Sequence, residues 1–175
     1  MDVRSATIAD IEPCKRLDGR YSTGYIWHMD EEIRPDAVNV ALRRVRLPRT
    51  LESRDPRCAD DLFEVWKNSR CFLVAEELGV VLGYLTMVIS RGNWQGWIEH
   101  LVVHRQYRRR GVAMMLLDGG ERWALESALR GVTAVVQSKN DPAIHLFPRR
   151  GYAFRGYMDG YFDSGDLGLL YSLGL

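Results

Sequence analysis

An arginine-rich loop followed by small residues is the segment whose types and spacing point most directly to chemistry. The start of a helix carries unpaired backbone N–H groups and the positive end of the helix dipole, which together bind anions such as a pyrophosphate. A glycine at the helix start lets the ligand approach the backbone, and nearby arginines add positive charge. The segment predicted to work in this way is Arg108, Arg109, Arg110, Gly111, Val112 and Ala113.

Two further patterns flank this predicted phosphate site. Before it, Gly96 to Val103 is an apolar run that predicts a strand. After it, Val132 to Gln137 is apolar and β-branched, which is typical of a buried strand. A short helix is then expected, with Asn140 or Asp141 as its cap and a proline in its first turn.

These patterns resemble the GNAT superfamily of N-acetyltransferases. Its signature, Arg/Gln-x-x-Gly-x-Gly/Ala, is matched by Arg108-x-x-Gly111-x-Ala113, and its later helix-to-strand motif is similar to Asn140-x-x-Ala143-Ile144-x-Leu146-Phe147-x-Arg149-x-Gly151-Tyr152. The string from Trp97 to Val103, with Trp123-Ala124-Leu125 in the following helix, looks similar to the streptothricin acetyltransferase branch. The resemblance covers roughly residues 71 to 157, and two ordered motifs are stronger than either alone.

The resemblance implies that the anion is acetyl-coenzyme A. In this superfamily the sheet splays beside the strand that precedes the signature, and the pantetheine arm bonds to free backbone groups there as an added strand would. We expect a bulge near Leu101 to Val103 to leave such groups unpaired. The residues implied by the resemblance to hold the cofactor, besides the loop, are Leu101, Val102, Val103, Asn140 and Phe147, and no metal site is expected.

Acetyl transfer to an amine requires a base or a water chain that removes a proton from the amine. Glu99 lies in an otherwise apolar strand and is the candidate base, acting through water; the alternative is a structural glutamate bonded to a neighbouring strand. His100 would point to the opposite face of a regular strand, and a lone histidine is more often simply packed and hydrogen-bonded. Because no cysteine lies in the motifs, we expect direct attack without a covalent enzyme intermediate.

Phe147 departs from the family pattern. Members often place a tyrosine there as general acid to the thiolate, and phenylalanine cannot donate a proton. Tyr152, Tyr157 or water are the replacements considered, although Tyr152 follows a glycine at the start of a strand and fits core packing better. Pro148 is expected to kink or end its helix.

The acceptor is expected to be a primary amine of a small molecule. Two acidic and aromatic clusters, residues 30–32 and 159–163, would suit a cationic amine or would simply be solvated faces. The alternatives are a protein or peptide N-acetyltransferase and a non-catalytic acetyl-CoA-binding module. A nucleic-acid role for residues 105–110 is disfavoured, since the formal net charge of the chain is only +1.

The elements that must position these residues predict one domain over residues 1–175. A meander of strands precedes a strand-helix-strand-helix-strand order, which predicts an α/β fold of the α+β type: a mixed, largely antiparallel sheet flanked by helices and splayed at the cofactor strand. Tyr21 to Asp36 is expected to be loop plus helix, and Val38 to Leu47 a strand ending at Pro48.

Composition is consistent with an intracellular enzyme. Hydrophobic residues make up 46% of the 175 residues and charged residues 27%, as in an ordinary globular domain. The three cysteines are widely spaced and fit a reducing cytoplasm. The first residues contain no apolar signal core, and no run is long enough to span a bilayer, so no membrane partner is expected. The sequence is compatible with a homodimer and does not decide between a dimer and a monomer.

Overall fold

A mixed sheet forms the centre of the fold. The structure is a computed structural model that describes residues 1–59, 61–90 and 92–175. In these residues the sheet has seven strands in the order β1-β4-β5-β6-β7-β9-β8, and only the β6–β7 pair is parallel. This confirms the predicted fold class. The strands are β1 (Asp2–Ser5), β4 (Cys71–Glu77), β5 (Val80–Ser90), β6 (Gln95–Val103), β7 (Gly131–Gln137), β8 (Ala153–Met158) and β9 (Gly168–Gly174).

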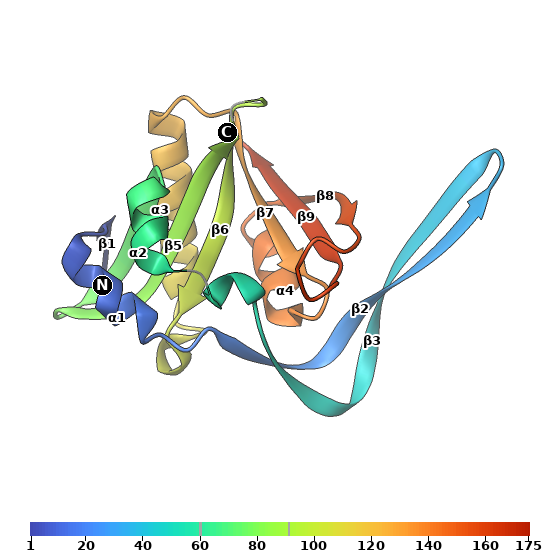
Figure 1. Ribbon diagram of the computed structural model, residues 1–175, viewed down its shortest axis with the longest axis horizontal. Coiled ribbons are helices and arrows are strands. Elements are labelled where there is room, and N and C mark those ends of the chain that lie inside the picture. Colours follow the sequence, from blue (N-terminus) through green and yellow to red (C-terminus); the bar gives the residue numbers. More distant parts are fainter. Residues whose placement is uncertain (60, 91) are drawn as a thin grey trace.

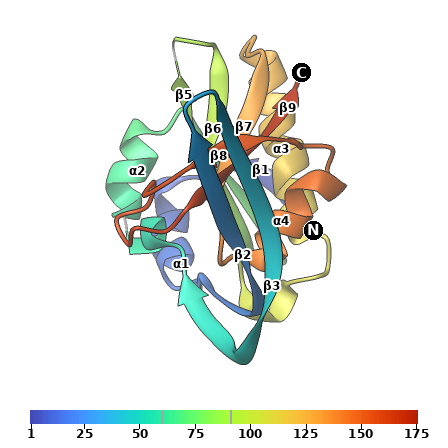
Figure 2. The same cartoon turned by 90° about the vertical axis from the view of Figure 1, so that its right-hand side faces the viewer.

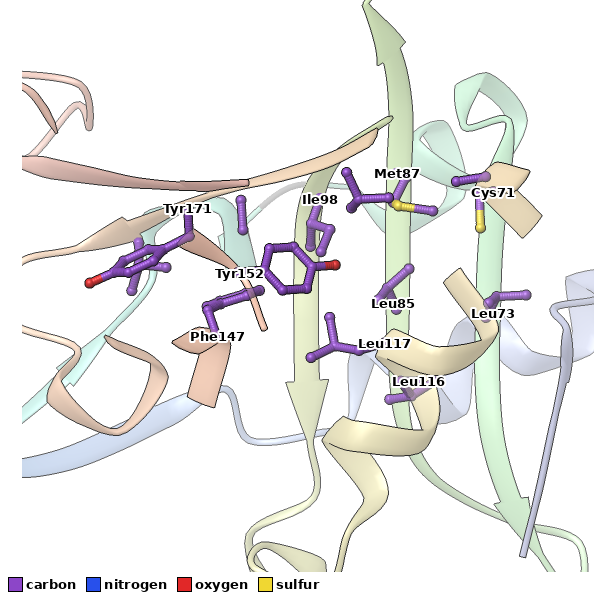
Figure 3. Close-up of a cluster of buried hydrophobic side chains, with 14 of the residues drawn as sticks. Cys71, Leu73, Leu85, Met87, Ile98, Leu116, Leu117, Phe147, Tyr152 and Tyr171 are labelled. Atoms are coloured by element: carbon purple, nitrogen blue, oxygen red, sulfur yellow. The ribbon is translucent and has the colours of Figure 1, made fainter. Parts of the chain in front are cut away.

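Helices cover both faces of this sheet and divide the interior into two cores (Figure 1). The α helices are α1 (Ile11–Lys15), α2 (Leu62–Asn68), α3 (Val112–Glu126) and α4 (Asp141–Arg149). The short 3₁₀ helices are η1 (Ile8–Asp10), η2 (Pro56–Ala59) and η3 (Arg105–Tyr107). The larger core lies under α3 and α4, where Leu116 and Leu117 are fully buried near Leu85 (Figure 3). A smaller core, which includes Ile11 and Leu62, lies under α1 and α2. Among the described residues, no helix is long and apolar enough to cross a membrane.

Strands β6 and β7 separate along their length. They pair from Gln95–Gly131 to Ile98–Ala134, and the ladder stops there although both strands continue. Figure 1 shows them close together at one end and apart at the other. The later part of β6 therefore turns a backbone edge toward β7 that β7 does not pair, which confirms the predicted splay.

A long β-hairpin stands away from the rest of the protein. Strands β2 (Arg20–Arg34) and β3 (Ala37–Arg54) pair with each other, and their far end extends well beyond the sheet (Figure 1). Figure 2 shows the same hairpin from the side of its far end. The expectation of loop plus helix over Tyr21–Asp36 is therefore wrong. The partner that makes this segment a strand is β3. Pro48 does not end β3, because the register skips residues 47–50 and the missing proline N–H is not needed in the ladder.

The base of this hairpin is fixed to the loop between β7 and α4. Trp27 N donates to Ser138 O at 2.8 Å, and Arg44 makes two 2.8 Å bonds to the carboxylate of Asp141. Trp27 Nε1 also donates to Asp141 at 3.3 Å. The bonds from Arg44 lower the pKa of Asp141 despite its partial burial. Aromatic packing and a paired charge thus hold the start of the hairpin beside the splayed strands.

Candidate cofactor and acceptor site

The backbone of the arginine-rich loop turns sharply into α3. Gly111 is the N-cap residue with φ +87°, and Arg109 also has a positive φ of +61°. Only glycine adopts such a conformation without strain, which explains its place at the helix start. Within the described part of the chain, the first bond of α3 runs from Met115 N to Gly111 O at 3.0 Å. The N–H groups of the preceding first turn, including those of Val112 and Ala113, are the ones that a helix leaves for an anion.

The three arginines of this loop differ in their contacts and in their exposure to solvent. Arg108 Nε donates to Val103 O at 3.0 Å and Nη2 to Asp18 O at 2.7 Å, so its side chain ties the loop to the end of β6 and to the segment that follows α1. Burial lowers the pKa of Arg108. Arg109 and Arg110 are exposed, and the Arg110 guanidinium lies 5.4 Å from the ring centre of Tyr107. The charge available to a bound phosphate therefore comes from Arg109 and Arg110.

The bulge expected near Leu101–Val103 lies at Glu99 instead. In the β5–β6 ladder Met87 pairs with Ile98 and Thr86 with His100, so Glu99 is the extra residue. An extra residue turns two consecutive side chains toward one side. Glu99 lines a cleft of about 360 Å³ with Val88 and residues of α2, and His100 also lies on the α1–α2 side. The prediction that the two side chains point to opposite faces is wrong, because it assumed a regular strand.

His100 is held as a structural residue. It is 3% exposed, its Nε2 donates to Arg57 O at 2.8 Å, and its Nδ1 lies 2.8 Å from Thr86 Oγ1. Both ring nitrogens are occupied by protein groups, which matches the packed and hydrogen-bonded alternative. Glu99 is partly exposed in its cleft and stays the candidate base.

The aromatic residues of the second motif belong mainly to the core. Phe147 is 3% exposed, stacked on Tyr171 and edge-on to Tyr152 (Figure 3), so its ring offers almost no surface to a cofactor. Burial raises the pKa of the Tyr152 hydroxyl, which confirms core packing and makes it a poor acid. Tyr157 lies on the outer strand β8 and donates to Glu31 of the hairpin at 3.1 Å. Neither tyrosine is placed as a replacement acid.

The start and end of α4 agree with the sequence prediction. Asn140 is the N-cap residue, and its side-chain oxygen accepts from Ala143 N at 3.2 Å. Pro148 lies in the last turn, and the helix ends at Arg149. Asn140 uses its amide oxygen in the cap, so its contact with the cofactor stays a prediction that depends on the remaining amide nitrogen.

The sequence did not reveal a polar network at the end of β7, on the open side of the splay. Tyr21 at the base of the hairpin donates to Gln137 at the end of β7 (3.0 Å), and Gln137 donates to Asp166 at 3.0 Å. Burial raises the pKa of Tyr21 to about 12. Arg57 in η2 lies between β6 and β7 themselves. Because these residues come from separate segments, only the folded topology brings them together.

The two acidic clusters lie at different places. Residues 30–32 belong to β2 of the hairpin, whereas residues 159–163 form the exposed loop after β8, in which only Phe162 is buried. The contact between Tyr157 and Glu31 links the hairpin to the end of β8. Both clusters thus lie on the side of the protein beyond β7, and their role toward an acceptor stays a prediction.

Comparison with known proteins identifies the class. Residues 39–152 match the acetyltransferase (GNAT) family. The chain belongs to this family, and the prediction of an acetyl-CoA-dependent N-acetyltransferase is thereby confirmed.

Sequence similarity to individual proteins points to the streptothricin acetyltransferase branch of the family. Streptothricin acetyltransferase of Streptomyces lavendulae is 27% identical over 165 residues, covering 89% of this chain and 82% of that protein. Streptothricin acetyltransferase of Escherichia coli is 37% identical over 59 residues, a match that spans only 34% of each chain. The resemblance to this branch is therefore confirmed in sequence.

Solved structures share the fold over nearly the whole chain. The crystal structure of nourseothricin acetyltransferase has a TM-score of 0.82 at 24% identity, covering 99% of this chain and 97% of that one. A Bacillus anthracis structure in complex with acetyl coenzyme A has a TM-score of 0.81 at 16% identity, with the same coverage. At these identities the likeness shows the fold alone.

Proposed function

We propose that this chain transfers the acetyl group of acetyl-CoA to a primary amine of a streptothricin-like antibiotic, by direct attack of the amine. The observation that carries the proposal is the helix start at Gly111 beside the unpaired edge of β6, in a chain similar to streptothricin acetyltransferases along most of its length. Residues 1–175 would form one catalytic domain.

The residues present fit the cofactor. The N–H groups of Val112 and Ala113 would face the pyrophosphate, with Arg109 and Arg110 beside it. The β6 backbone from Leu101 to Val103 would pair with the pantetheine arm, because β7 leaves that edge open. When bound, acetyl-CoA supplies the activated acetyl group.

Proton transfer is assigned to Glu99, acting through water in its cleft. The carboxylate would accept the proton that the acceptor amine must lose before it attacks. No tyrosine of the second motif is placed as an acid, so the leaving thiolate would depart without one. This is chemically acceptable, because an ordinary thiol has a pKa of about 8.5.

The acceptor class is tested by product analysis. The purified protein is incubated with acetyl-CoA and an equimolar mixture of streptothricin, an aminoglycoside, a polyamine and a short peptide, and the masses of all products are measured. We expect one acetyl group on streptothricin before any other acceptor reacts. Acetylation of the peptide first would favour the protein N-acetyltransferase alternative, and cofactor binding without any product would favour the binding module.

We also propose a homodimer formed through the hairpin. The face of the hairpin that packs on the core at Trp27 and Leu42 continues outward as an apolar strip. In this strip Ile33 is 70% exposed and its cross-strand partner Val38 is 61% exposed. A two-stranded ribbon alone is only marginally stable in water, so this strip needs a cover.

Charge on the hairpin favours a second copy as that cover. The far half carries Asp30, Glu31, Glu32 and Asp36 with one arginine, Arg34, whereas the half nearer the sheet carries Arg43, Arg44, Arg46 and Arg49. Two hairpins that pack antiparallel about a twofold axis would place each acidic end beside the partner's basic half.

Sedimentation velocity tests the dimer. Ile33→Lys puts a charge in the apolar strip and is expected to give a monomer where the parent gives a dimer. Val45→Lys is the matched control, because Val45 is an exposed residue on the opposite face of the same hairpin. A monomeric parent, or a dimer that survives Ile33→Lys, would contradict the proposal.

We further propose that the protein is cytoplasmic, in keeping with its three unpaired cysteines.

A further inference from the structure

Arg57 occupies the point at which β6 and β7 part. The last pair of their ladder is Ile98 with Ala134. The guanidinium of Arg57 donates from Nη2 to Val135 O of β7 at 3.0 Å and makes a longer bond, 3.5 Å, from Nη1 to Ile98 O of β6. One side chain thus bonds to both strands at the end of their pairing.

This guanidinium is held firmly from its other side. Asp55 accepts two bonds from it, at 2.9 Å from Nε and 2.5 Å from Nη2, and also accepts from the backbone N of Arg57 at 3.0 Å. The ring of Phe162 lies 5.2 Å from the guanidinium carbon. The side chain is only 23% exposed. A charge in this position is paired, and its planar fork is fixed in direction.

The backbone of the same residue is fixed to β6. Arg57 O accepts the 2.8 Å bond from His100, whose other ring nitrogen lies beside Thr86 of β5. Arg57 is therefore attached to β6 at two places, through its backbone and through its side chain, and to β7 at a third. Both strands are thus bonded to one residue at this end of their pairing.

We propose that Arg57 is a positioning residue that sets the opening between β6 and β7 and thereby the place of the reacting acetyl group. The proposal rests on the proposed acetyltransferase function. The phosphate end of the cofactor site lies at Gly111, at the far end of β6, whereas Arg57 lies at the closed end of the splay. A change in this opening would alter the alignment of the reacting groups more than the affinity for acetyl-CoA.

The first test is a kinetic comparison of Arg57→Lys with the parent. Lysine keeps the charge but lacks the planar fork that serves both strands and Asp55. We expect kcat to fall about 10-fold, since small misplacements of reacting groups cost this much or more, with KM for acetyl-CoA changed less than about 2-fold. Arg20→Lys is the matched control, because Arg20 is also paired with an aspartate but lies on the surface.

The second test uses the protein without any ligand, so that it stands apart from activity. Hydrogen–deuterium exchange in Arg57→Lys is expected to rise in peptides that cover residues 98–101 and 135–137, and to stay unchanged in β4. Asp55→Asn, which loosens the guanidinium without removing it, is expected to give a smaller rise in the same peptides. If the parent itself transfers no acetyl group, the proposed function fails. Hydrogen–deuterium exchange still tests whether Arg57 holds β6 and β7 in place. Unchanged exchange, or a kcat equal to that of the parent, would overturn the inference.

Discussion

Replacing Glu99 with glutamine is expected to lower kcat for amine acetylation by about 10²-fold or more, because a positioned general base contributes at least this factor. The substitution keeps the size of the side chain and its place at the bulge of β6, and removes the negative charge and with it the ability to accept a proton. KM for acetyl-CoA should change little, since the predicted cofactor contacts lie further along β6 and in the loop that follows it. Steady-state kinetics with saturating acceptor measure both constants.

The matched control for this substitution is Glu64→Gln. Glu64 lines the same cleft from α2 but is exposed and paired with Lys67 at 2.7 Å. It is expected to retain the kcat of the parent. Equal kcat in Glu99→Gln and in the parent would remove Glu99 as the base, and equal losses in both variants would point to the charge of the cleft rather than to proton transfer.

Replacing Gly111 with valine is expected to raise KM for acetyl-CoA about 5- to 30-fold, since a β-branched residue at positive φ is strained by about 1–2 kcal/mol and relieves this strain by moving the backbone. No protein atom lies within 4 Å of the position that a Cβ would take at Gly111, so the side chain causes no internal clash. It would instead enter the space expected for the pyrophosphate and displace the N–H groups that face it.

Gly79→Val separates backbone strain from cofactor binding. Gly79 has a similar φ of +79° in an equally open turn between β4 and β5, outside the cofactor loop. Both variants should lose a similar amount of stability in urea unfolding, but only Gly111→Val should bind acetyl-CoA more weakly. If both variants, or neither, raised KM, the assignment of the phosphate site to Gly111 would fail.

Local chemistry made the cofactor loop predictable. The start of α3 at Gly111 and the cap of α4 at Asn140 depend on residues next to each other in the chain, and both lie where the sequence placed them. Apolar runs also located the central strands of the main sheet, because β4, β5 and β7 are buried on both faces between the helix layers. The structure therefore agrees with the sequence wherever neighbouring residues decide the conformation.

Features that depend on distant segments escaped sequence reasoning. Residues 21–34 form a strand because β3 pairs with them, and nothing within those residues indicates that partner. The bulge at Glu99 depends on register against β5, so the alternation of β6 alone suggested a regular strand. Arg57 acquires its place only when β6 and β7 are brought together and then part. Isolated polar residues of this kind carry no periodic signal.

The central claim is that this chain moves an acetyl group from acetyl-CoA to a small antibiotic amine. The most direct measurement is the initial rate of thiol release from acetyl-CoA, with and without streptothricin, for the parent and for Gly111→Val at the same cofactor concentration. We expect release that requires streptothricin and that falls in the variant at low acetyl-CoA. Absence of streptothricin-dependent release from a folded parent that binds acetyl-CoA would contradict it.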